Sequence, residues 1–333
     1  MEKAMDARFD ILGIGNAMVD VVAQVDEDFL AEHGMAKGTM TLIDAAAAER
    51  IYAGMPAGQE SSGGSAANTC AVAAALGASV AYFGCVAEDQ LGQVFRHDIT
   101  ASGVHFPTPA LPLGAAGGGA PTARCLIAVT PDAQRTMNTY LGACVAFGEA
   151  QVDVATVAAA RVTYLEGYLF DPPAAQAAFR RAAGVAQQAG RSVALSLSDP
   201  FCVGRHREAF RELVRTGVDI LFANEAEIGS LYGVERAEDA VRLVREETKL
   251  AVLTMSERGS LIVAGEDVIR IAAAPTTVVD TTGAGDAYAA GFLTAWTKGR
   301  PLAACGALGA AAAAATIARV GARPPAVVLE TLL

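Results

Sequence analysis

The chain has 333 residues, of which 53% are hydrophobic and 18% are charged, with a formal net charge of −11. This length is enough for one large domain or two ordinary ones. An acidic chain without a lysine or arginine cluster is not suited to binding nucleic acid or an anionic membrane. The six cysteines form no C-x-x-C pair and the four histidines no metal-ligand spacing. With no apolar leader before residue 9, we expect a cytoplasmic protein with reduced thiols.

The first predicted element is a buried strand at 9–16 that ends in a glycine-rich turn. Its G-x-G-N ending is similar to the beginning of a dinucleotide-binding fingerprint. The third glycine is missing and Asp20 follows too early, so we reject that assignment. Further strands are predicted at 18–25 and 38–43, and a helix at 45–52.

A second glycine-rich turn, S-G-G-S-A-A-N at 62–68, leads into a helix predicted at 69–76. Paired glycines before a helix let backbone amides come close to a ligand. Asn68 can offer a donor and an acceptor to a hydroxyl group, although capping or packing would also explain an asparagine there. A strand at 79–84 and a strand-to-helix turn at 84–92 follow.

Residues 105–142 differ in composition and pattern from the rest of the chain. They contain prolines and short alternating stretches at 123–130 and 135–141. These features predict extended, hairpin-like structure rather than helices. No stretch is rich enough in proline, glycine and serine to separate two independent domains, so we expect a single domain over 1–333.

From residue 152 onward, predicted strands and helices alternate. The strands are at 161–166, 192–196, 220–223 and 250–255, and the helices at 174–189, 207–215, 225–232 and 237–247. This alternation indicates a parallel sheet with right-handed crossovers. Ligands bind beyond the carboxyl ends of such strands, which is where Asp199, Asn224 and Thr254 fall.

Asn224 and Glu227 begin the helix predicted at 225–232 and share one of its faces. Together they can order water around Mg²⁺, which keeps several waters and is held partly through substrate phosphates. Taken alone, N-x-x-E is also an ordinary helix start in which the two residues cap the helix.

The heptad D-T-T-G-A-G-D at 280–286 is the most informative stretch. It follows a β-branched run at 276–279, predicted to be a strand, and precedes an apolar helix that extends through Trp296. Its glycines permit a tight turn, and the free N–H groups of the first helical turn favour an anion. Asp286 lies in that turn, where it could take a proton from a hydroxyl that attacks a phosphoryl group. Capping is the plainer explanation for an isolated G-x-G-D.

The motifs at 62–68, 224–227 and 280–286 resemble, in order and approximate spacing, those of the ribokinase-like (PfkB) sugar and nucleoside kinases. The resemblance extends over 16–324. It implies an α/β protein of three α/β/α layers, with a mostly parallel central sheet and a small β-strand lid built from 17–45 and 105–142.

The same resemblance implies ATP and Mg²⁺ as cofactors and a set of site residues. Asp286 is then the general base, and the amides of Gly283, Ala284 and Gly285 form the anion hole. Acceptor binding is assigned to Asp20, Asn16, Gly64, Ser65 and Asn68. Contacts with ATP and Mg²⁺ are assigned to Asn224, Glu227, Thr254, Gly259 and Thr282. Asp280 and Thr282 are candidates for a monovalent-cation site, with K⁺ as the ion.

Within the family, the similarity is greatest to adenosine kinases, through G-N-A-M-V-D at 15–20, R-T-M at 135–137, E-G-Y-L at 166–169 and L-S-D-P-F at 197–201. We therefore expect ATP-dependent phosphorylation of the 5′-hydroxyl of adenosine to AMP, by a monomer or homodimer. Tyr168 and Phe170 are candidates for a flat purine-binding surface, although core packing explains each equally well. The alternatives are a kinase for another nucleoside or for ribose, fructose or 2-keto-3-deoxygluconate, a silent nucleoside-binding protein, and a dinucleotide-dependent oxidoreductase.

Overall fold

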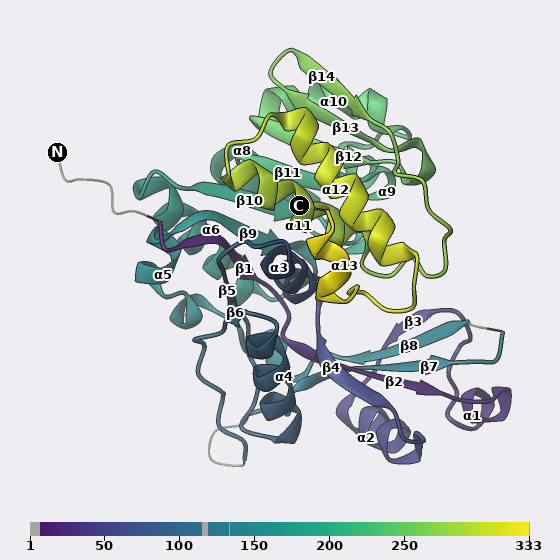
Figure 1. Cartoon of the computed structure of the whole chain (residues 1–333). Coiled ribbons are helices and arrows are strands. Elements are labelled where there is room, and N and C mark those ends of the chain that lie inside the picture. Colours follow the sequence, from purple (N-terminus) through teal and green to yellow (C-terminus); the bar gives the residue numbers. More distant parts are fainter. Residues whose placement is uncertain (1–6, 115–118, 133, 333) are drawn as a thin grey trace.

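A large sheet of nine strands forms the centre of the molecule (Figure 1). The computed structural model describes residues 7–114, 119–132 and 134–332. The strand order is β14-β13-β12-β11-β10-β9-β1-β5-β6, parallel from β12 to β6, with β13 and β14 antiparallel. The strands are β1 (Phe9–Ile14), β5 (Val80–Phe83), β6 (Val104–His105), β9 (Ala160–Glu166), β10 (Ser192–Ser196), β11 (Ile220–Asn224), β12 (Leu250–Thr254), β13 (Ser260–Ala264) and β14 (Asp267–Ile271).

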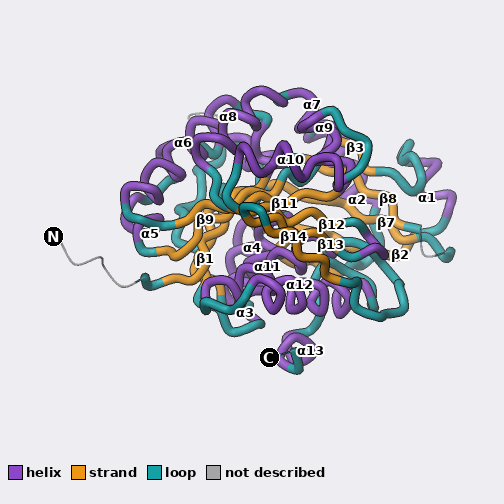
Figure 2. Tube along the Cα trace, turned by 90° about the horizontal axis from the view of Figure 1, so that it is seen from above, coloured by secondary structure: helices purple, strands orange, loops and turns teal. Residues whose placement is uncertain are grey.

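Helices cover both faces of this sheet, as the view from above shows (Figure 2). One layer contains α5 (Val154–Ala158), α6 (Pro173–Gln188), α7 (Pro200–Arg205), α8 (Arg207–Gly217), α9 (Glu225–Tyr232) and α10 (Ala237–Glu247). The other contains α3 (Ser65–Ala75), α4 (Gln90–Ala101), α11 (Ala284–Thr297), α12 (Leu302–Ile317) and, at its edge, α13 (Ala326–Glu330). The predicted three-layer α/β/α architecture is confirmed.

The alternation of side chains along β1 explains why the strands are apolar on both sides. Ile11 belongs to the core shared with α3 and α11, whereas its neighbour Leu12 belongs to the core shared with α6 and α8. Successive strand residues point to opposite faces, and a sheet covered on both faces needs apolar residues at each position.

A second sheet of five strands, in the order β3-β8-β7-β2-β4, lies beside the large one (Figure 1). Its strands are β2 (Met18–Gln24), β3 (Met40–Leu42), β4 (Gln59–Gly63), β7 (Ala123–Val129) and β8 (Arg135–Tyr140). The helices α1 (Glu27–Glu32) and α2 (Ala45–Gly54) lie against this sheet. The hairpin predicted from 123–141 is present as the antiparallel pair β7 and β8. β4 lies outside the two ranges predicted to build a lid, and the closing movement itself stays a prediction.

The register of the second sheet sets which side chains share its inner face. Asp20 pairs with Cys125, Cys125 with Thr139, and Thr139 with Leu42, so the four stand in one row across the sheet. All four line the cavity described below, which identifies this face as the one turned toward the large sheet.

α11 and α12 pack closely because glycines lie where they meet. A Cβ atom on Gly291 would come within 2.6 Å of the Leu308 carbonyl oxygen, and one on Gly309 within 2.9 Å of Tyr288. The apolar, Ala-rich stretch at 301–318 thus forms a helix, buried along one side, that supports α11. No helix in the described part of the chain is long and apolar enough to cross a membrane.

Two local predictions were wrong. The run 276–279 is not a strand: Val278 and Val279 are 59% and 55% exposed, and the amide of Val279 donates to the Ile317 carbonyl at the end of α12. β-branched residues favour strands only where they pack in a sheet, and here they do not. The helix predicted from residue 69 begins four residues earlier, at Ser65, after Gly64 with a φ of 98°.

Candidate functional site

A cavity of about 790 Å³ lies between the carboxyl ends of the central strands and the inner face of the second sheet. It gathers residues that are far apart in the sequence. Of the predicted site residues, it is lined by Asn16, Asp20, Gly64, Ser65, Asn68, Asn224, Glu227, Thr254, Thr282, Gly283, Ala284, Gly285 and Asp286. Gly259 and Asp280 are the two that do not line it.

Asp286 lies in the first turn of α11, with its carboxylate held by α3. Ser65 Oγ donates to Asp286 Oδ1 at 2.6 Å, and Asn68 Nδ2 donates to Oδ2 at 3.3 Å. Burial raises the pKa of Asp286 to about 6, although these hydrogen bonds and the positive charge of Arg323 oppose the rise. Asp286 is therefore ionised at neutral pH and basic enough to accept a proton.

The turn before α11 leaves room for a ligand next to its backbone. Gly283 has a φ of 75°, and a Cβ atom there would lie 2.5 Å from the Ala322 carbonyl oxygen. Nothing lies within 4 Å of a Cβ atom built on Gly285, which faces the cavity. The amide of Ala284 donates to the Thr281 carbonyl at 3.2 Å. The amides of Gly285 and Asp286, in the first helical turn, have no intrahelical acceptor and can bind an anion.

Asp20 projects from β2 into the same cavity, from the opposite sheet. Among the described residues, no hydrogen bond reaches its carboxylate. A Cβ atom on Gly63 would lie 2.3 Å from the Asp20 carboxyl group, so a larger residue there would displace this carboxyl group. Burial raises the pKa of Asp20 to about 6, against the charges of Arg323 and Arg135. A buried carboxylate without a partner is suited to accepting hydrogen bonds from a polar ligand.

Glu166, at the end of β9, is a site residue to which the sequence motifs assigned no role. It is 1% exposed and accepts hydrogen bonds from Asn16 N at 3.2 Å, Asn16 Nδ2 at 2.7 Å and Ala66 N at 2.7 Å. Burial raises its pKa to about 7, against the effect of these hydrogen bonds. Gly15 makes room for it, since a Cβ atom there would lie 2.3 Å from Glu166 Oε2. Glu166 therefore fixes the end of β1 to the start of α3.

Arg323 is the other residue missed, and it lies in the loop between α12 and α13. Its Nε donates to Asn68 Oδ1 at 2.7 Å and its Nη1 to Ser62 Oγ at 2.9 Å. The side chain of Asp98 is its ion-pair partner at 3.5 Å. The signal available in the sequence was that Arg319 and Arg323 are the only charged residues between 301 and 329.

Asn224 and Glu227 form a reciprocal capping box at the start of α9. Asn224 N and Nδ2 donate to the Glu227 carboxylate at 2.9 and 2.6 Å, and Glu227 N donates to Asn224 Oδ1 at 2.9 Å. Burial raises the pKa of Glu227 to about 7, and the charges of Asp199 and Asp286 add to the rise. Capping and exposure to the cavity are thus compatible, and a divalent cation would relieve the repulsion among these carboxylates.

Asp280 and Gly259 do not line the cavity. They stabilise the conformation of the backbone around it. Asp280 accepts hydrogen bonds from Thr282 N at 3.0 Å and Gly321 N at 2.8 Å, and it forms an ion pair with Arg135 at 3.0 Å. Gly259 has a φ of 81° in the turn between β12 and β13, where a Cβ atom would lie 2.0 Å from the Ile271 carbonyl oxygen.

Comparison with known proteins identifies the family. The model of the pfkB family carbohydrate kinases matches residues 38–328. The chain belongs to the PfkB family. It is therefore a phosphotransferase that uses ATP, with an alcohol group of a sugar or nucleoside as the acceptor.

Two solved structures resemble this PfkB-family chain over 98% of both chains, each with a TM-score of 0.87. They are the adenosine kinase from Sinorhizobium meliloti, at 51% identity, and a probable sugar kinase from Rhizobium etli CFN 42, at 48%. The nucleoside kinase of Methanothermobacter thermautotrophicus is 30% identical over 75% of this chain and 76% of the relative. A match to the cytidine kinase of Thermococcus kodakarensis, 39% identical, covers 32% of this chain and 38% of the relative.

Apolar side chains line the mouth of the cavity in this PfkB-family kinase. Tyr168 and Phe201, from the large sheet's side, are 45% and 76% exposed, and Met40 and Leu42 of β3 are 51% and 58% exposed. Phe170 is excluded as a ligand surface, because it is 1% exposed and its ring stacks on Phe210 at 4.1 Å in the core.

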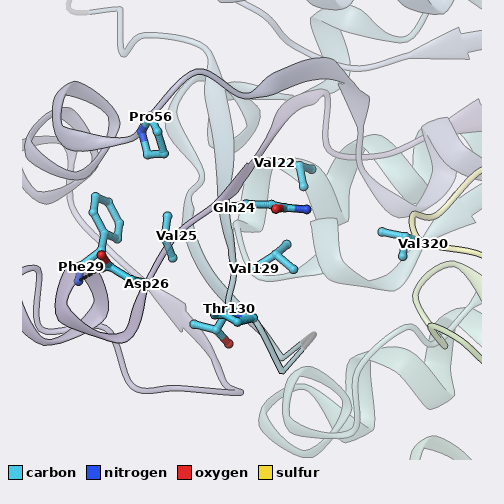
Figure 3. A pocket seen from close by; sticks show the side chains of 10 residues that line it. Val22, Gln24, Val25, Asp26, Phe29, Pro56, Val129, Thr130 and Val320 are labelled. Atoms are coloured by element: carbon cyan, nitrogen blue, oxygen red, sulfur yellow. Dashed lines mark hydrogen bonds between the residues drawn. The ribbon is translucent and has the colours of Figure 1, made fainter.

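A second cavity, of about 700 Å³, extends along the distal part of the second sheet (Figure 3). Val22, Gln24 and Val129 line it from the inner face of β2 and β7, and Val320 lines it from the loop that carries Arg323. None of the motif residues borders it.

Proposed function

We propose that this chain is an adenosine kinase, which transfers the γ-phosphoryl group of ATP to the 5′-hydroxyl of adenosine and produces AMP and ADP. The observation that carries the proposal is that Asp20 of β2 and Asp286 of α11 project into one cavity from opposite sides. Their carboxylates are close enough for the charge of Asp286 to raise the pKa of Asp20. The similarity to the adenosine kinase from Sinorhizobium meliloti supports the choice of acceptor.

The two carboxylates have complementary roles in this proposal. Asp20 accepts no hydrogen bond from the described residues, and we assign it hydrogen bonds from the adjacent 2′- and 3′-hydroxyls of ribose, a charge-assisted contact. Asn16, Gly64, Ser65 and Asn68 complete the ribose site around it. The apolar mouth with Tyr168 and Phe201 suits the flat face of a purine. An acceptor bound in this way directs its 5′-hydroxyl toward Asp286.

Asp286 acts as the general base. It takes the proton of the 5′-hydroxyl while the bond from O5′ to the γ-phosphorus forms and the bond from phosphorus to the β,γ-bridging oxygen breaks. ADP leaves, and the proton returns to solvent from the carboxyl group. The free amides of Gly285 and Asp286, at the positive end of α11, stabilise the charge on the phosphoryl oxygens, whereas the amide of Ala284, also predicted for this anion hole, already donates to the Thr281 carbonyl. Positioning and charge stabilisation are what phosphoryl transfer chiefly requires of a protein.

Asn224 and Glu227 fit a magnesium site, because they offer hard oxygen donors next to further carboxylates. When bound, Mg²⁺ would neutralise charge on the ATP phosphates. Thr254 and Thr282 lie where they can contact the nucleotide. Asp280 fits a potassium site poorly, because it does not line the cavity and Arg135 pairs with its charge. No step of the mechanism depends on K⁺.

The test is a panel of acceptors assayed with Mg-ATP, with the phosphorylated product identified by chromatography. Adenosine should give AMP with the highest kcat/KM. If ribose, fructose or 2-keto-3-deoxygluconate turned over as efficiently, the nucleoside assignment would fall while the kinase assignment survived. The panel includes sugars because a probable sugar kinase is 48% identical to this chain.

We further propose that the enzyme works in the cytoplasm as a monomer or homodimer. All six cysteines are free and buried, which suits a reducing compartment. Light scattering of the purified chain would distinguish the two oligomeric states.

A further inference from the structure

Arg323 is connected to Asp286 through the side chain of Asn68. Its Nε donates to Asn68 Oδ1 at 2.7 Å, and Asn68 Nδ2 donates in turn to Asp286 Oδ2 at 3.3 Å. An arginine can only donate and an ionised carboxylate can only accept. The Asn68 amide is therefore held in one orientation, with its oxygen toward Arg323 and its nitrogen toward Asp286.

The guanidinium group is also fixed from the side of the second sheet. Nη1 donates to Ser62 Oγ of β4 and approaches Asp98 Oδ2 of α4 at 3.5 Å, and Ser62 donates to the same Asp98 carboxylate. Its loop is anchored by the hydrogen bond from Gly321 N to Asp280 Oδ2. Several hydrogen bonds and an ion pair thus hold Arg323. It cannot rotate away from Asn68 without breaking these contacts.

The positive charge of Arg323 also acts on ionisable groups to which this side chain donates no hydrogen bond. The ionisable groups that face it are Asp98 of α4, Asp20 of β2, Asp286 of α11 and Cys70 of α3. Its positive charge lowers the pKa of both Asp20 and Asp286, against the effect of burial. Nη2 is buried and has no hydrogen-bond partner among the described residues.

We propose that Arg323 is a positioning residue for phosphoryl transfer, which orients the Asn68 amide toward Asp286 and balances the charges of Asp20 and Asp286. This proposal rests on the proposed function. It explains how two carboxylates can remain ionised in one cavity that binds an uncharged acceptor. It also gives a physical reason for Arg323 in a stretch where Arg319 is the only other charged residue.

The test combines two substitutions of Arg323 with a double-mutant cycle. Arg323→Met should lower kcat about 10- to 100-fold and move the acidic limb of the kcat/KM profile up by about one pH unit, because a compensating positive charge is lost. Arg323→Lys keeps the charge but cannot reproduce the planar fork. It should lower kcat while leaving the acidic limb at the wild-type pH. Arg300→Met is the matched control, since Arg300 is exposed beyond the opposite end of α11.

The cycle uses Asn68→Ala. If Arg323 acts through Asn68, adding Arg323→Lys to Asn68→Ala should reduce kcat by less than about twofold more, because residues in one network are not additive. Multiplicative effects, or an unshifted acidic limb in Arg323→Met, would overturn the proposal. Thermal unfolding and ATP titration identify any variant that is merely misfolded, and the lysine variant then carries the test. If adenosine is not the acceptor, the same cycle is run with the best acceptor of the panel, so the two proposals fail separately.

Discussion

Ser65 Oγ donates to Asp286 Oδ1 at 2.6 Å, which joins the first turns of α3 and α11 across 221 residues of sequence. Both helix N-termini therefore point into one cavity. The contact brings the glycine-rich turn at 62–68 and the heptad at 280–286 together, and it holds the carboxylate of Asp286 in place before any acceptor binds.

The first prediction concerns this carboxylate. Asp286→Asn keeps an oxygen that can accept from Ser65 but cannot take up the hydroxyl proton. We expect kcat to fall roughly 10²- to 10⁴-fold, with ATP affinity and thermal stability close to wild type. Steady-state kinetics and ATP titration measure the two effects. Asp267→Asn, at an exposed position in β14, is the control. Near-normal turnover of the Asp286 variant would exclude it as the base.

The second prediction concerns the metal. Glu227→Gln retains an oxygen that can accept from Asn224, so the capping box and α9 should persist. It removes one negative charge, and we expect the Mg²⁺ concentration for half-maximal rate to rise several-fold, with little change in adenosine binding. Glu225→Gln, in the same turn and paired with Arg258, is the control. Superimposable Mg²⁺ titrations would leave Glu227 with a capping role alone.

The third prediction concerns the acceptor. Removing the 2′-hydroxyl leaves one oxygen of the Asp20 carboxylate desolvated and unpaired, at a cost of about 1–3 kcal/mol. Adenosine should therefore exceed 2′-deoxyadenosine by about 5- to 150-fold in kcat/KM. In Asp20→Asn this preference should shrink, because the charged acceptor is gone. A preference that persisted unchanged in the variant would place the discrimination elsewhere.

The fourth prediction concerns the pH dependence of stability. Burial raises the pKa of Glu166 and Glu227 to about 7, and that of Asp20 and Asp286 to about 6, all above their unfolded values near 4. The folded state therefore binds protons that the unfolded state does not bind between about pH 4 and pH 7. Stability should fall as the pH rises through this window.

The measurement is the melting temperature of the ligand-free protein at constant ionic strength. We expect it to be higher at pH 6 than at pH 8. Glu166→Gln cannot ionise, so it should reduce this difference, although it keeps an oxygen for the Asn16 donors only and loses the acceptor of the Ala66 amide. A melting temperature that rises between pH 6 and pH 8 in wild type would contradict the account.

The parallel sheet could be predicted from local patterns, whereas the three layers and most of the cavity lining were implied by the resemblance to the PfkB kinases. Periodicity identified the strands from β9 to β12, and the glycine-rich turns pointed to Gly64, Gly283 and Gly285. Arg323 carried no such pattern, and the pattern around Glu166 predicted a strand and a motif but no role for its side chain. Glu166 closes a strand and Arg323 lies in a loop, and their partners are 150 and 255 residues away. Their positions become meaningful only after folding brings those partners close.

Other differences between the predictions and the structure also arise from tertiary packing. The run at 276–279 has the composition of a strand, but the sheet offers it no place. Phe170 has the chemistry of a purine-stacking residue, but the rings of Phe179 and Phe210 enclose it. Asn224 and Glu227 satisfied the capping pattern and the cavity prediction at once, since a helix start can lie at the edge of a site.

The contact between Gly63 and Asp20 bears on any attempt to redesign the acceptor. A methyl group at position 63 would occupy space that the Asp20 carboxyl group fills, with only 2.3 Å between them. The two positions are therefore coupled. A library that varies position 63 alone would mostly return variants with a displaced Asp20. One that pairs Gly63→Ala with a smaller residue at position 20 would reshape the floor beneath the sugar, and new acceptor preferences should be sought among such pairs.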